Sequence, residues 1–493
     1  MTVEVRDAGV ELLPDPSRVV ARLVMLGEVY TRTGSRAGDV MERIEAIPTD
    51  ALHDAAERIL ADFGSRHEDF EALLHRNAAT VAFRAGEVPT MDRDREIVLG
   101  AAFTAEQSVE AAALCNPSVV PHPDQSGLAT GQLRLAISLR AIGEGHVSSI
   151  AFASAVVDPV SGWTFDERPL PLVTATVSEG DWTRGEFRAS LETEGRLNEV
   201  SGAILRALPA TFHSSQIEKA IGVVPSEIAQ QLETRDDLDQ IRIMAWSAYR
   251  AAFDPSSSLG QRVLTPAASE EMNGIEDARF VLFTHDDGST EYRATYTAYN
   301  GHAIASRLII SPDLVSFTVH RLSGPAARNK GTALFPRPIG GALFALTRTN
   351  GENTSVARSS DGVSWTDIAV LHRPDGLWEI VQTGNCGSPI ETPAGWLVLL
   401  HGVGPMRQYS ISAMLLDLDD PTIVRGRLTE PLLKPVGDAR EGYVPNVVYT
   451  CGAMLHEGTI WIPYGIGDQR IRVASVQLDA VLAAMVPVQP PRP

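Results

Sequence analysis

Apolar residues in the first part of the chain recur at the three- and four-residue spacing of amphipathic helices. Residues 40–47 and 51–60 show this spacing, and Pro48-Thr-Asp50 between them supplies a break and an N-cap for the second helix. The pattern continues over residues 70–75. The sequence therefore predicts an N-terminal helical region over residues 1–113, which we expect to serve packing or oligomerisation.

From residue 116 the period changes to the alternation of β-strands, as in residues 133–140 and 150–157. Helical spacing returns over about 215–252 and predicts a helical insertion between strand regions. Short strands and turns then dominate to about residue 474. We expect a mainly β domain over residues 114–480, and a C-terminal tail over 481–493.

Weak self-similarity marks the β region. Residues 311–317 (SPDLVSF) and 359–365 (SSDGVSW) each place a polar turn and an aspartate before an aromatic residue, after an apolar run. Recurrent turns every 40 to 60 residues suggest the radial repetition of a β-propeller. A β-sandwich is the competing all-β interpretation, because the number of strands alone does not separate the two.

The charge balance narrows the partners. Lys and Arg number 42 against 62 Asp and Glu, a net charge of -20, so neither nucleic acid nor a membrane is expected to bind. The three cysteines form no CxxC pair, which argues against a disulfide framework or a zinc knuckle. No apolar run reaches the roughly 18 residues that cross a bilayer, and no secretory signal begins the sequence. We expect a cytoplasmic protein.

Polar residues beside glycines recur at the ends of the predicted strands. In a propeller one end of every inner strand converges on a central funnel, so these residues would line one pocket. The clusters are Asn116-Pro-Ser118, Arg140-Ala-Ile-Gly-Glu-Gly-His146, Asn329-Lys-Gly331, Gly384-Asn-Cys-Gly387, His401-Gly402, Glu441-Gly-Tyr-Val-Pro-Asn446 and Tyr464-Gly-Ile-Gly-Asp468.

Residues 273–280 (NGIEDARF) carry the strongest candidate chemistry. Side chains alternate along a strand, so Asp277 and Arg279 are expected on one face, with Glu276 and Ala278 on the other. A carboxylate held beside an arginine at the mouth of a strand suits a general acid or base. From these residues alone, a surface ion pair is the alternative.

Several other chemistries lack their motifs. Gly143-Glu-Gly-His146 has neither the lysine nor the hydroxyl of a phosphate loop. The histidines show no zinc spacing, and no Gly-x-Ser-x-Gly elbow occurs. We therefore expect no metal and no serine nucleophile.

Taken together, the clusters resemble a known family. Asn273-Gly-Ile-Glu-Asp-Ala-Arg279 resembles the Gly-x-Glu-Asp-Pro-Arg signature of glycoside hydrolase family 130, the β-mannoside phosphorylases and related mannosidases. Further motifs agree in the order of the family: Asn116-Pro-Ser118, Leu139-Arg-Ala141, Asn329-Lys-Gly-Thr-Ala-Leu-Phe-Pro336, Gly395-Trp-Leu-Val-Leu-Leu-His-Gly-Val403, Leu415-Leu-Asp-Leu-Asp-Asp-Pro421, Asn446-Val-Val-Tyr-Thr-Cys-Gly452 and Tyr464-Gly-Ile-Gly-Asp468.

The resemblance covers roughly residues 116–480 and implies a five-bladed β-propeller with helical additions. Those additions are similar to the longer members that act on β-1,2-linked mannosides. Ala278 replaces the usual proline of the signature, and Leu139 and Leu400 replace tyrosines, so aromatic contacts at those two points are not assumed.

By resemblance, Asp277 is the general acid and delivers its proton through a hydroxyl of the bound mannose. Phosphate then attacks with inversion to give α-mannose 1-phosphate. Phosphate is already anionic and needs cations rather than a strong base, and guanidinium suits its geometry. We expect the phosphate site at Arg140, Arg307, Lys330 and His401. Contacts to the mannoside are expected from Asn116, Ser118, Glu276, Arg279 and Asp468.

Two other functions stay open. An inverting hydrolase needs a second carboxylate about 6.5–9.5 Å from the acid to activate water, and Glu144, Glu379 and Glu441 are available. A non-catalytic sugar-binding propeller would be expected to lack the acid, yet Asp277 is present. The phosphorylase needs no cofactor beyond phosphate as co-substrate, and we expect a homo-oligomer.

Overall fold

The computed structural model describes residues 3–25, 36–86 and 91–488. The chain forms two compact units. One consists of Asp15–Ala111 with Pro169–Thr174, and the other of the segment that ends at Pro14, Ala112–Arg168 and the chain from Ala175 onward. The expected helical region began at residue 1, whereas the segment up to Pro14 belongs to the β unit.

The smaller unit is a helical body with one short β-ribbon. Its helices are α1 (Arg36–Glu45), α2 (Thr49–Phe63), α3 (Phe70–Arg84) and α4 (Arg93–Ala102), and β2 (Val19–Leu23) pairs with β3 (Thr104–Ser108). Helices α3 and α4 pack so closely at Gly100 that a Cβ there would lie 2.1 Å from the carbonyl oxygen of Leu74. Buried apolar side chains such as Leu52 and Leu99 fill the space between the helices.

Apart from a two-stranded ribbon in the helical insertion, the larger unit contains five antiparallel sheets in the part of the chain that is described, and a single parallel pairing of Gly274 with Ser148 joins the first two. In chain order, the first sheet consists of β4 (Ala113–Pro121), β5 (Leu133–Ile142), β6 (Ser148–Asp158), β7 (Gly162–Phe165) and β13 (Arg262–Leu264), and the second of β14 (Gly274–Thr284), β15 (Thr290–Tyr299), β16 (Ile304–Ser311), β17 (Ser316–Arg321), β12 (Tyr249–Ala252) and β9 (Thr176–Glu179). The third sheet consists of β18 (Ala333–Leu334), β19 (Leu343–Thr347), β20 (Thr354–Ser359) and β21 (Thr366–His372), and the fourth of β22 (Gln382–Asn385), β23 (Ile390–Thr392), β24 (Gly395–Val403), β25 (Tyr409–Leu416), β26 (Val424–Arg427) and β31 (Val486–Pro487). The fifth sheet consists of β27 (Val448–Tyr449), β28 (Met454–His456), β29 (Thr459–Ile466), β30 (Arg470–Gln477) and β1 (Arg6–Leu12).

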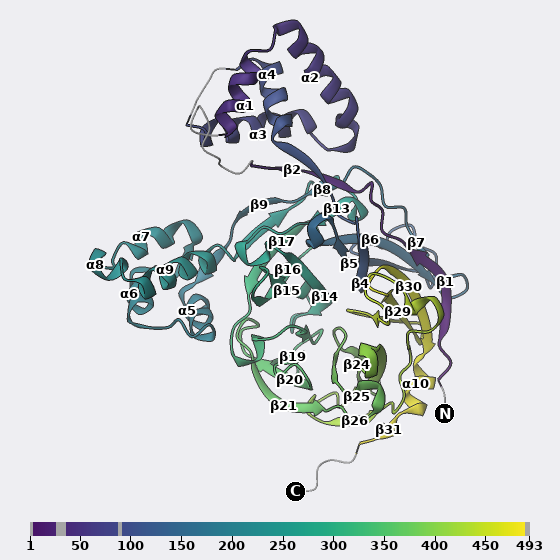
Figure 1. The fold of residues 1–493 in the computed structure, drawn as a ribbon. Coiled ribbons are helices and arrows are strands. Elements are labelled where there is room, and N and C mark those ends of the chain that lie inside the picture. Colours follow the sequence, from purple (N-terminus) through teal and green to yellow (C-terminus); the bar gives the residue numbers. More distant parts are fainter. Residues whose placement is uncertain (1–2, 26–35, 87–90, 489–493) are drawn as a thin grey trace. The chain divides into compact units, whose positions relative to one another are not determined.

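These sheets are the blades of a propeller, set in a ring (Figure 1). The ring closes through β1, which pairs antiparallel with β30, so the start of the chain completes the blade built by its end. Because the sheets follow one another around an axis instead of facing in two layers, the propeller expected from the sequence is confirmed over the sandwich.

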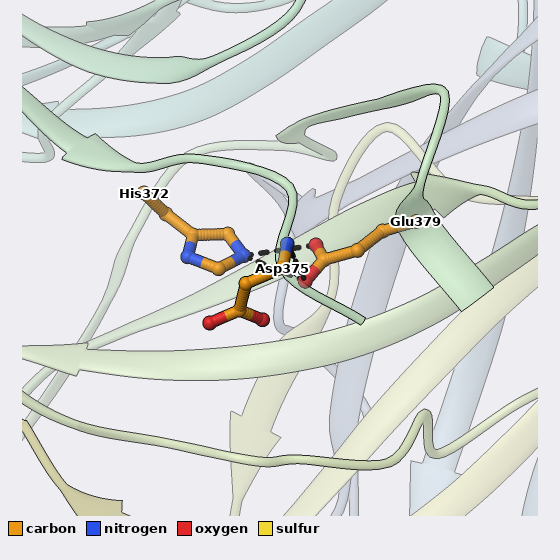
Figure 2. A group of neighbouring side chains, drawn as sticks. All are labelled: His372, Asp375 and Glu379. Atoms are coloured by element: carbon orange, nitrogen blue, oxygen red, sulfur yellow. Dashed lines mark hydrogen bonds and ion pairs between the residues drawn. The ribbon is translucent and has the colours of Figure 1, made fainter. Parts of the chain in front are cut away.

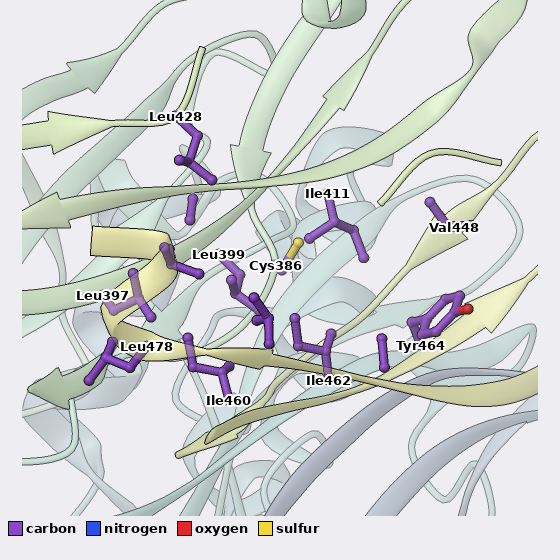
Figure 3. Close-up of a cluster of buried hydrophobic side chains, with 14 of the residues drawn as sticks. Cys386, Leu397, Leu399, Ile411, Leu428, Val448, Ile460, Ile462, Tyr464 and Leu478 are labelled. Atoms are coloured by element: carbon purple, nitrogen blue, oxygen red, sulfur yellow. The ribbon is translucent and has the colours of Figure 1, made fainter. Parts of the chain in front are cut away.

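Neighbouring blades bury apolar side chains between them, as the close-up of the last two blades shows (Figure 3). Leu397 and Leu399 of β24 meet Ile460 and Ile462 of β29 in this cluster. Strand β24 is buried along its whole length, so its sequence reads as a continuous apolar run without alternation. This packing fixes the inner strands of the blades along the axis.

The helical insertion is longer than the sequence indicated. It contains α5 (Arg184–Thr193), α6 (Glu199–Ala207), α7 (Ile217–Ile221), α8 (Ser226–Ala229) and α9 (Leu232–Ala245), with the ribbon β10 (Asp181–Thr183) and β11 (Thr211–His213). It therefore begins some 30 residues before the expected position, and residues 249–252 are a strand instead of a helix. A capping box between Thr183 and Glu186 starts α5.

Other elements complete the described chain. They are β8 (Val173–Thr174) and α10 (Leu478–Ala484). The expected C-terminal tail includes β31, while residues 489–493 lie outside the described residues. None of the described helices is long and apolar enough to cross a membrane.

Candidate active site

The inner strands of the blades converge on a cavity of about 430 Å³. Its walls come from every blade, which is why residues far apart in the sequence meet there. The lining residues are Asn116, Arg140, Asp277, Arg279, Lys330, Gly331, Arg348, Gln382, His401, Arg407, Tyr409, Val444, Pro445, Val447, Tyr449 and Asp468.

Asp277 occupies a bulge in β14. The pairing of β14 with β15 shifts register between Glu276 and Arg279, and Asp277 has a left-handed backbone with φ 56°. Asp277 and Arg279 line the same cavity, as expected, but the expected placement of Glu276 on the opposite face is wrong, because an extra residue interrupts the pleat. Glu276 and Asp277 both reach Arg140, whose Nη2 lies 2.7 Å from Glu276 Oε1 and whose Nη1 lies 3.3 Å from Asp277 Oδ1.

A second bulge, in β4, faces the first. Asn116 has φ 50° at the register shift between Cys115 and Ser118, and its Nδ2 donates to Asp277 Oδ1 at 2.5 Å. The buried Oδ1 of Asn116 has no hydrogen-bond partner among the described residues. An unsatisfied buried acceptor is costly, so this oxygen is suited to a hydroxyl of a ligand.

Arg279 lines the cavity beside Asp277. Its guanidinium is 3% exposed and donates to the backbone oxygens of Cys386 and Asp277 and to the hydroxyl of Tyr449. These bonds tie three blades together beneath the cavity and fix the guanidinium in place.

The charge around Asp277 is strongly positive. Burial alone would raise the pKa of this carboxyl. The nearby charges of Arg140, Arg279 and Lys330, with the hydrogen bond from Asn116, outweigh burial and lower the pKa of Asp277 to about 2.

Asp468, the second carboxyl of the cavity, behaves in the opposite way. It follows Gly467 in a turn where both residues have positive φ. Burial raises the pKa of Asp468 to about 6, and the charge of Arg140 offsets that effect only in part. The two carboxyl groups of the cavity thus have pKa values pushed apart by their surroundings, an arrangement common in active sites.

A wall of β24 and its neighbours faces the two carboxyl groups. His401 is 1% exposed, and its Nε2 lies 3.0 Å from Nη1 of Arg348. Burial and the charge of Arg348 lower the pKa of His401 far below its ordinary value, so the ring is neutral. Gly384 permits this contact, because a Cβ there would lie 2.1 Å from Cδ of Arg348. The Nε of Arg348 is buried without a hydrogen-bond partner among the described residues.

Seven of the ten site residues predicted from the sequence line this cavity: Asn116, Arg140, Asp277, Arg279, Lys330, His401 and Asp468. Glu276 lies directly beside it, bonded to Arg140 and with Oε2 3.8 Å from Nζ of Lys330.

Arg307 and Ser118 are not part of the wall. Arg307 is fully buried within the blade of β14 to β17, where it forms an ion pair with Glu270 and donates to the carbonyl of Ser247. Its placement at the phosphate site is therefore corrected, because a neighbouring carboxylate already occupies the guanidinium. The Oγ of Ser118 accepts from the backbone N–H of Phe280 at 3.0 Å and joins β4 to β14 beneath the site.

Sequence reasoning missed Arg348, Arg407, Gln382, Tyr409 and Tyr449 in the wall. Arg348 follows the apolar strand β19, as the other candidates follow theirs, but no glycine is next to it in the sequence.

The three glutamates considered as hydrolytic bases lie outside the described lining of the cavity. Glu379 is completely buried and accepts from His372 Nε2 at 2.8 Å (Figure 2). With Asp375 these side chains form the one group of three in the described chain whose metal-ligating atoms lie within 4.8 Å. Asp375 is paired with Arg427, so the members already satisfy one another or a neighbour. The cluster holds the loop between β21 and β22.

Comparison with known proteins gives consistent matches. A family model described as beta-1,4-mannooligosaccharide phosphorylase matches residues 258–486. A 1,2-beta-oligomannan phosphorylase of Thermoanaerobacter sp. (strain X514) is 33% identical over 232 residues, which are 45% of this chain and 75% of that protein. A beta-1,2-mannobiose phosphorylase of Listeria innocua is 32% identical over 227 residues, 44% of this chain and 62% of that protein.

Among solved structures, a beta-1,2-mannobiose phosphorylase from Listeria innocua in complex with beta-1,2-mannobiose matches with a TM-score of 0.44 and 20% identity. That match covers 77% of this chain and 92% of the other. The acid signature of β14, the matched model and relatives above 30% identity along most of their length lead to one conclusion: the chain belongs to glycoside hydrolase family 130.

Proposed function

We propose that this protein is an inverting glycoside phosphorylase that transfers mannose from a β-mannoside, preferably β-1,2-linked, to inorganic phosphate. The observation that carries the proposal is the composition of one cavity. It combines a carboxylate on a bulge, Asp277, with an excess of cations: five arginine and lysine side chains against two aspartates. In a chain of net charge -20, such a local excess suits an anionic substrate. The relatives named above are phosphorylases of β-1,2-mannosides.

In this proposal Asp277 is the general acid. Hydrogenphosphate attacks the anomeric carbon, the bond from that carbon to the leaving oxygen breaks, and this oxygen takes the proton of Asp277 through a mannose hydroxyl. The proton of hydrogenphosphate then restores the acid, so charge and protons balance. The product is α-mannose 1-phosphate, because attack comes from the face opposite the leaving group.

Phosphate also solves a problem of protonation. A carboxyl with a pKa of about 2 carries no proton at neutral pH. A phosphate dianion bound beside the same cations would offset their charge and raise the pKa of Asp277. We therefore propose that the acid becomes protonated only when phosphate is bound, which disfavours reaction with water.

The proposed roles of the other residues follow their contacts. Asn116, Arg279 and Asp468 hold the mannose at the cleavage point, because they surround Asp277. Lys330 and His401 take part in phosphate binding, and Arg348 joins them in place of Arg307. Arg140 and Glu276 were expected at the phosphate and the mannoside, respectively; we propose instead that they position Asp277, because Arg140 bonds to both carboxylates.

The rival function is an inverting β-mannosidase that uses water. Within the described lining of the cavity, its base would have to be Asp468, whose pKa of about 6 suits a base at neutral pH. A non-catalytic sugar-binding propeller is the third possibility, and it predicts no turnover at all.

The deciding experiment incubates the purified protein with β-1,2-mannobiose or β-1,4-mannosyl-glucose, with and without inorganic phosphate. We expect α-mannose 1-phosphate, formed only when phosphate is present. Free mannose released at the same rate without phosphate would show a hydrolase and overturn the proposal.

An acid variant tests the proposed chemistry. Asp277→Asn should abolish turnover while the fold remains intact. Asp286→Asn is the matched control, because Asp286 is exposed in the turn after the same strand, and it should keep full activity. A cytoplasmic location, a homo-oligomeric state and independence from any cofactor other than phosphate stay predictions.

A further inference from the structure

The turn between β24 and β25 keeps two long side chains in an unfavourable backbone conformation. Met406 has φ 57° and Arg407 has φ 53°, and the bond from Gly404 N–H to Gln408 O, 3.0 Å long, closes the turn. Consecutive left-handed residues in a hairpin are usually asparagine and glycine, because a Cβ there crowds the backbone. A methionine and an arginine are uncommon at such positions, and backbone strain of this kind occurs often at functional sites.

The two side chains have different surroundings. Met406 is 89% exposed and does not line the cavity, whereas Arg407 does. Arg407 donates from Nη2 to the hydroxyl of Tyr409 at 3.1 Å, and its guanidinium carbon lies 6.0 Å from the centre of that ring. The left-handed turn therefore brings the guanidinium back over its own hairpin to the mouth of the cavity.

Arg407 also differs from Arg140 and Lys330 in its partners. Arg140 is bonded to Glu276 and Asp277, and Lys330 lies 3.8 Å from Glu276. Among the described residues, no carboxylate lies within ion-pair distance of Arg407. A guanidinium that no carboxylate neutralises, in a strongly acidic protein, retains its charge for a ligand.

The neighbours of Arg407 lead inward to a second guanidinium of the same kind. Tyr409 stacks on His401 with 6.1 Å between ring centres, and Nε2 of His401 lies 3.0 Å from Nη1 of Arg348. Arg348 likewise has no carboxylate partner among the described residues, and its Nη2 donates to the carbonyl of Gly351. Two guanidinium groups thus flank an aromatic pair on one wall.

We propose that Arg407 is a specificity-determining residue that captures the phosphate dianion at the mouth of the cavity and delivers it to Arg348. The inference rests on the proposed phosphorylase function. It gives a reason for an arginine in this turn: with its left-handed backbone, Arg407 lines the cavity. In the reverse reaction the same guanidinium binds the phosphate group of α-mannose 1-phosphate.

The test compares Arg407→Ala, Arg407→Gly and Arg407→Lys with wild type in steady-state phosphorolysis of β-1,2-mannobiose. The matched control is Arg373→Ala, which removes an exposed arginine from the loop after β21, outside the cavity lining. We expect Arg407→Ala to raise the KM for phosphate at least about tenfold, with kcat and the KM for mannobiose within about twofold of wild type, because the substrate contact that is lost is the one to phosphate. The KM of Arg407→Lys for phosphate should lie between the values of wild type and Arg407→Ala, because lysine keeps the charge but loses the bidentate contact.

Arg407→Gly separates binding from structure. Glycine adopts positive φ without strain, so this variant should melt at the temperature of wild type or above while its KM for phosphate rises as in Arg407→Ala. A variant that melts at a lower temperature, with a lower kcat and a higher KM for both substrates, would show a structural role and overturn the inference.

The phosphate dependence of the wild type distinguishes the remaining outcomes. If turnover by the wild type depends on phosphate but Arg407→Ala keeps the same KM for phosphate, the role of Arg407 is refuted and the proposed phosphorylase function stands. Wild type that needs no phosphate refutes the proposed function, and this inference with it.

Discussion

Replacing Asp468 by asparagine should stabilise the protein at neutral and alkaline pH. The folded protein raises the pKa of this carboxyl from 3.8 to about 6, chiefly because the group is buried. Above that pH the folded state must keep a charge that the unfolded chain solvates better. The substitution would retain the size of the side chain and one of its oxygens without the charge, and asparagine tolerates the left-handed backbone found here.

The magnitude follows from the shift. A difference of about 2 pKa units corresponds to a destabilisation of about 3 kcal/mol above pH 7, since each unit is worth about 1.4 kcal/mol. Because folding raises the pKa of Asp468, the stability of the wild type relative to Asp468→Asn is fully present below pH 3.8 and is lost as the pH rises through about 6. At pH 5 the charged carboxylate causes roughly half of this destabilisation. About 3 kcal/mol is an upper value, because water that enters the cavity would screen the charge.

Thermal unfolding at pH 8 and pH 5 measures the effect. With about 2.1 cal/mol/K of unfolding entropy per residue, the larger unit of nearly 400 residues should melt about 4 °C higher in Asp468→Asn at pH 8. The gain should fall to about half of that at pH 5.

Asp277→Asn is the contrasting control. Its pKa of about 2 lies below the unfolded value of 3.8, so the charged carboxylate stabilises the folded state above pH 4 by about 2 kcal/mol. Asparagine there should lower the melting temperature at pH 8, and that loss should disappear only as the pH falls toward 2. A gain in Asp468→Asn that is the same at both pH values, or a loss at pH 8, would refute the assignment of opposite pKa shifts.

Three further variants test the remaining parts of the site. Lys330→Ala should raise the KM for phosphate far more than the KM for the mannoside, and equal effects on both would contradict its assignment. Gly384→Ala should displace Arg348, because the new Cβ would lie 2.1 Å from its Cδ. We expect a higher KM for phosphate and a lower melting temperature, whereas Gly185→Ala, with no atom nearer than 3.9 Å, should change neither. Ser118→Ala should cost about 1–3 kcal/mol, because it leaves a buried backbone N–H of β14 without its acceptor, and urea titration would measure this. A changed mannoside KM with unchanged stability would instead indicate contact with sugar.

The sequence predicts most of this site because a propeller brings strand ends to one axis. Glycine-flanked polar residues at those ends, such as His401, and polar residues beside a proline, such as Asn116, are recognisable without any knowledge of distant contacts. Arg307, which has neither glycine nor proline beside it, was assigned to the phosphate site, but it lies within β16 and pairs with Glu270, 37 residues earlier, a contact that forms only in the folded blade. Arg348 was missed for the converse reason. The glycine that gives it room, Gly384, belongs to the next blade.

The bulges were not predicted, and their physical cause explains the site. In a regular blade strand, alternate side chains point to the two faces of the sheet, and both faces pack against neighbouring blades. Arg140 and His401 reach the cavity from regularly paired strand positions, whereas other lining side chains come from residues that leave the ladder. Asn116 and Asp277 do so in facing bulges, and Asp468 and Arg407 in turns, each with φ between 46° and 56°.

Glycine would adopt each of these conformations without strain, but it has no side chain to offer a ligand. Asparagine, aspartate and arginine at these positions are consistent with a loss of stability where the protein contacts its ligand. The four positions should therefore share one property: glycine substitution should maintain or raise the melting temperature wherever the lost contacts are weak, and it should lower turnover or affinity at all four. Arg407 has weak protein contacts, a single hydrogen bond to Tyr409 and no carboxylate partner among the described residues, so the separation between stability and function should be clear there.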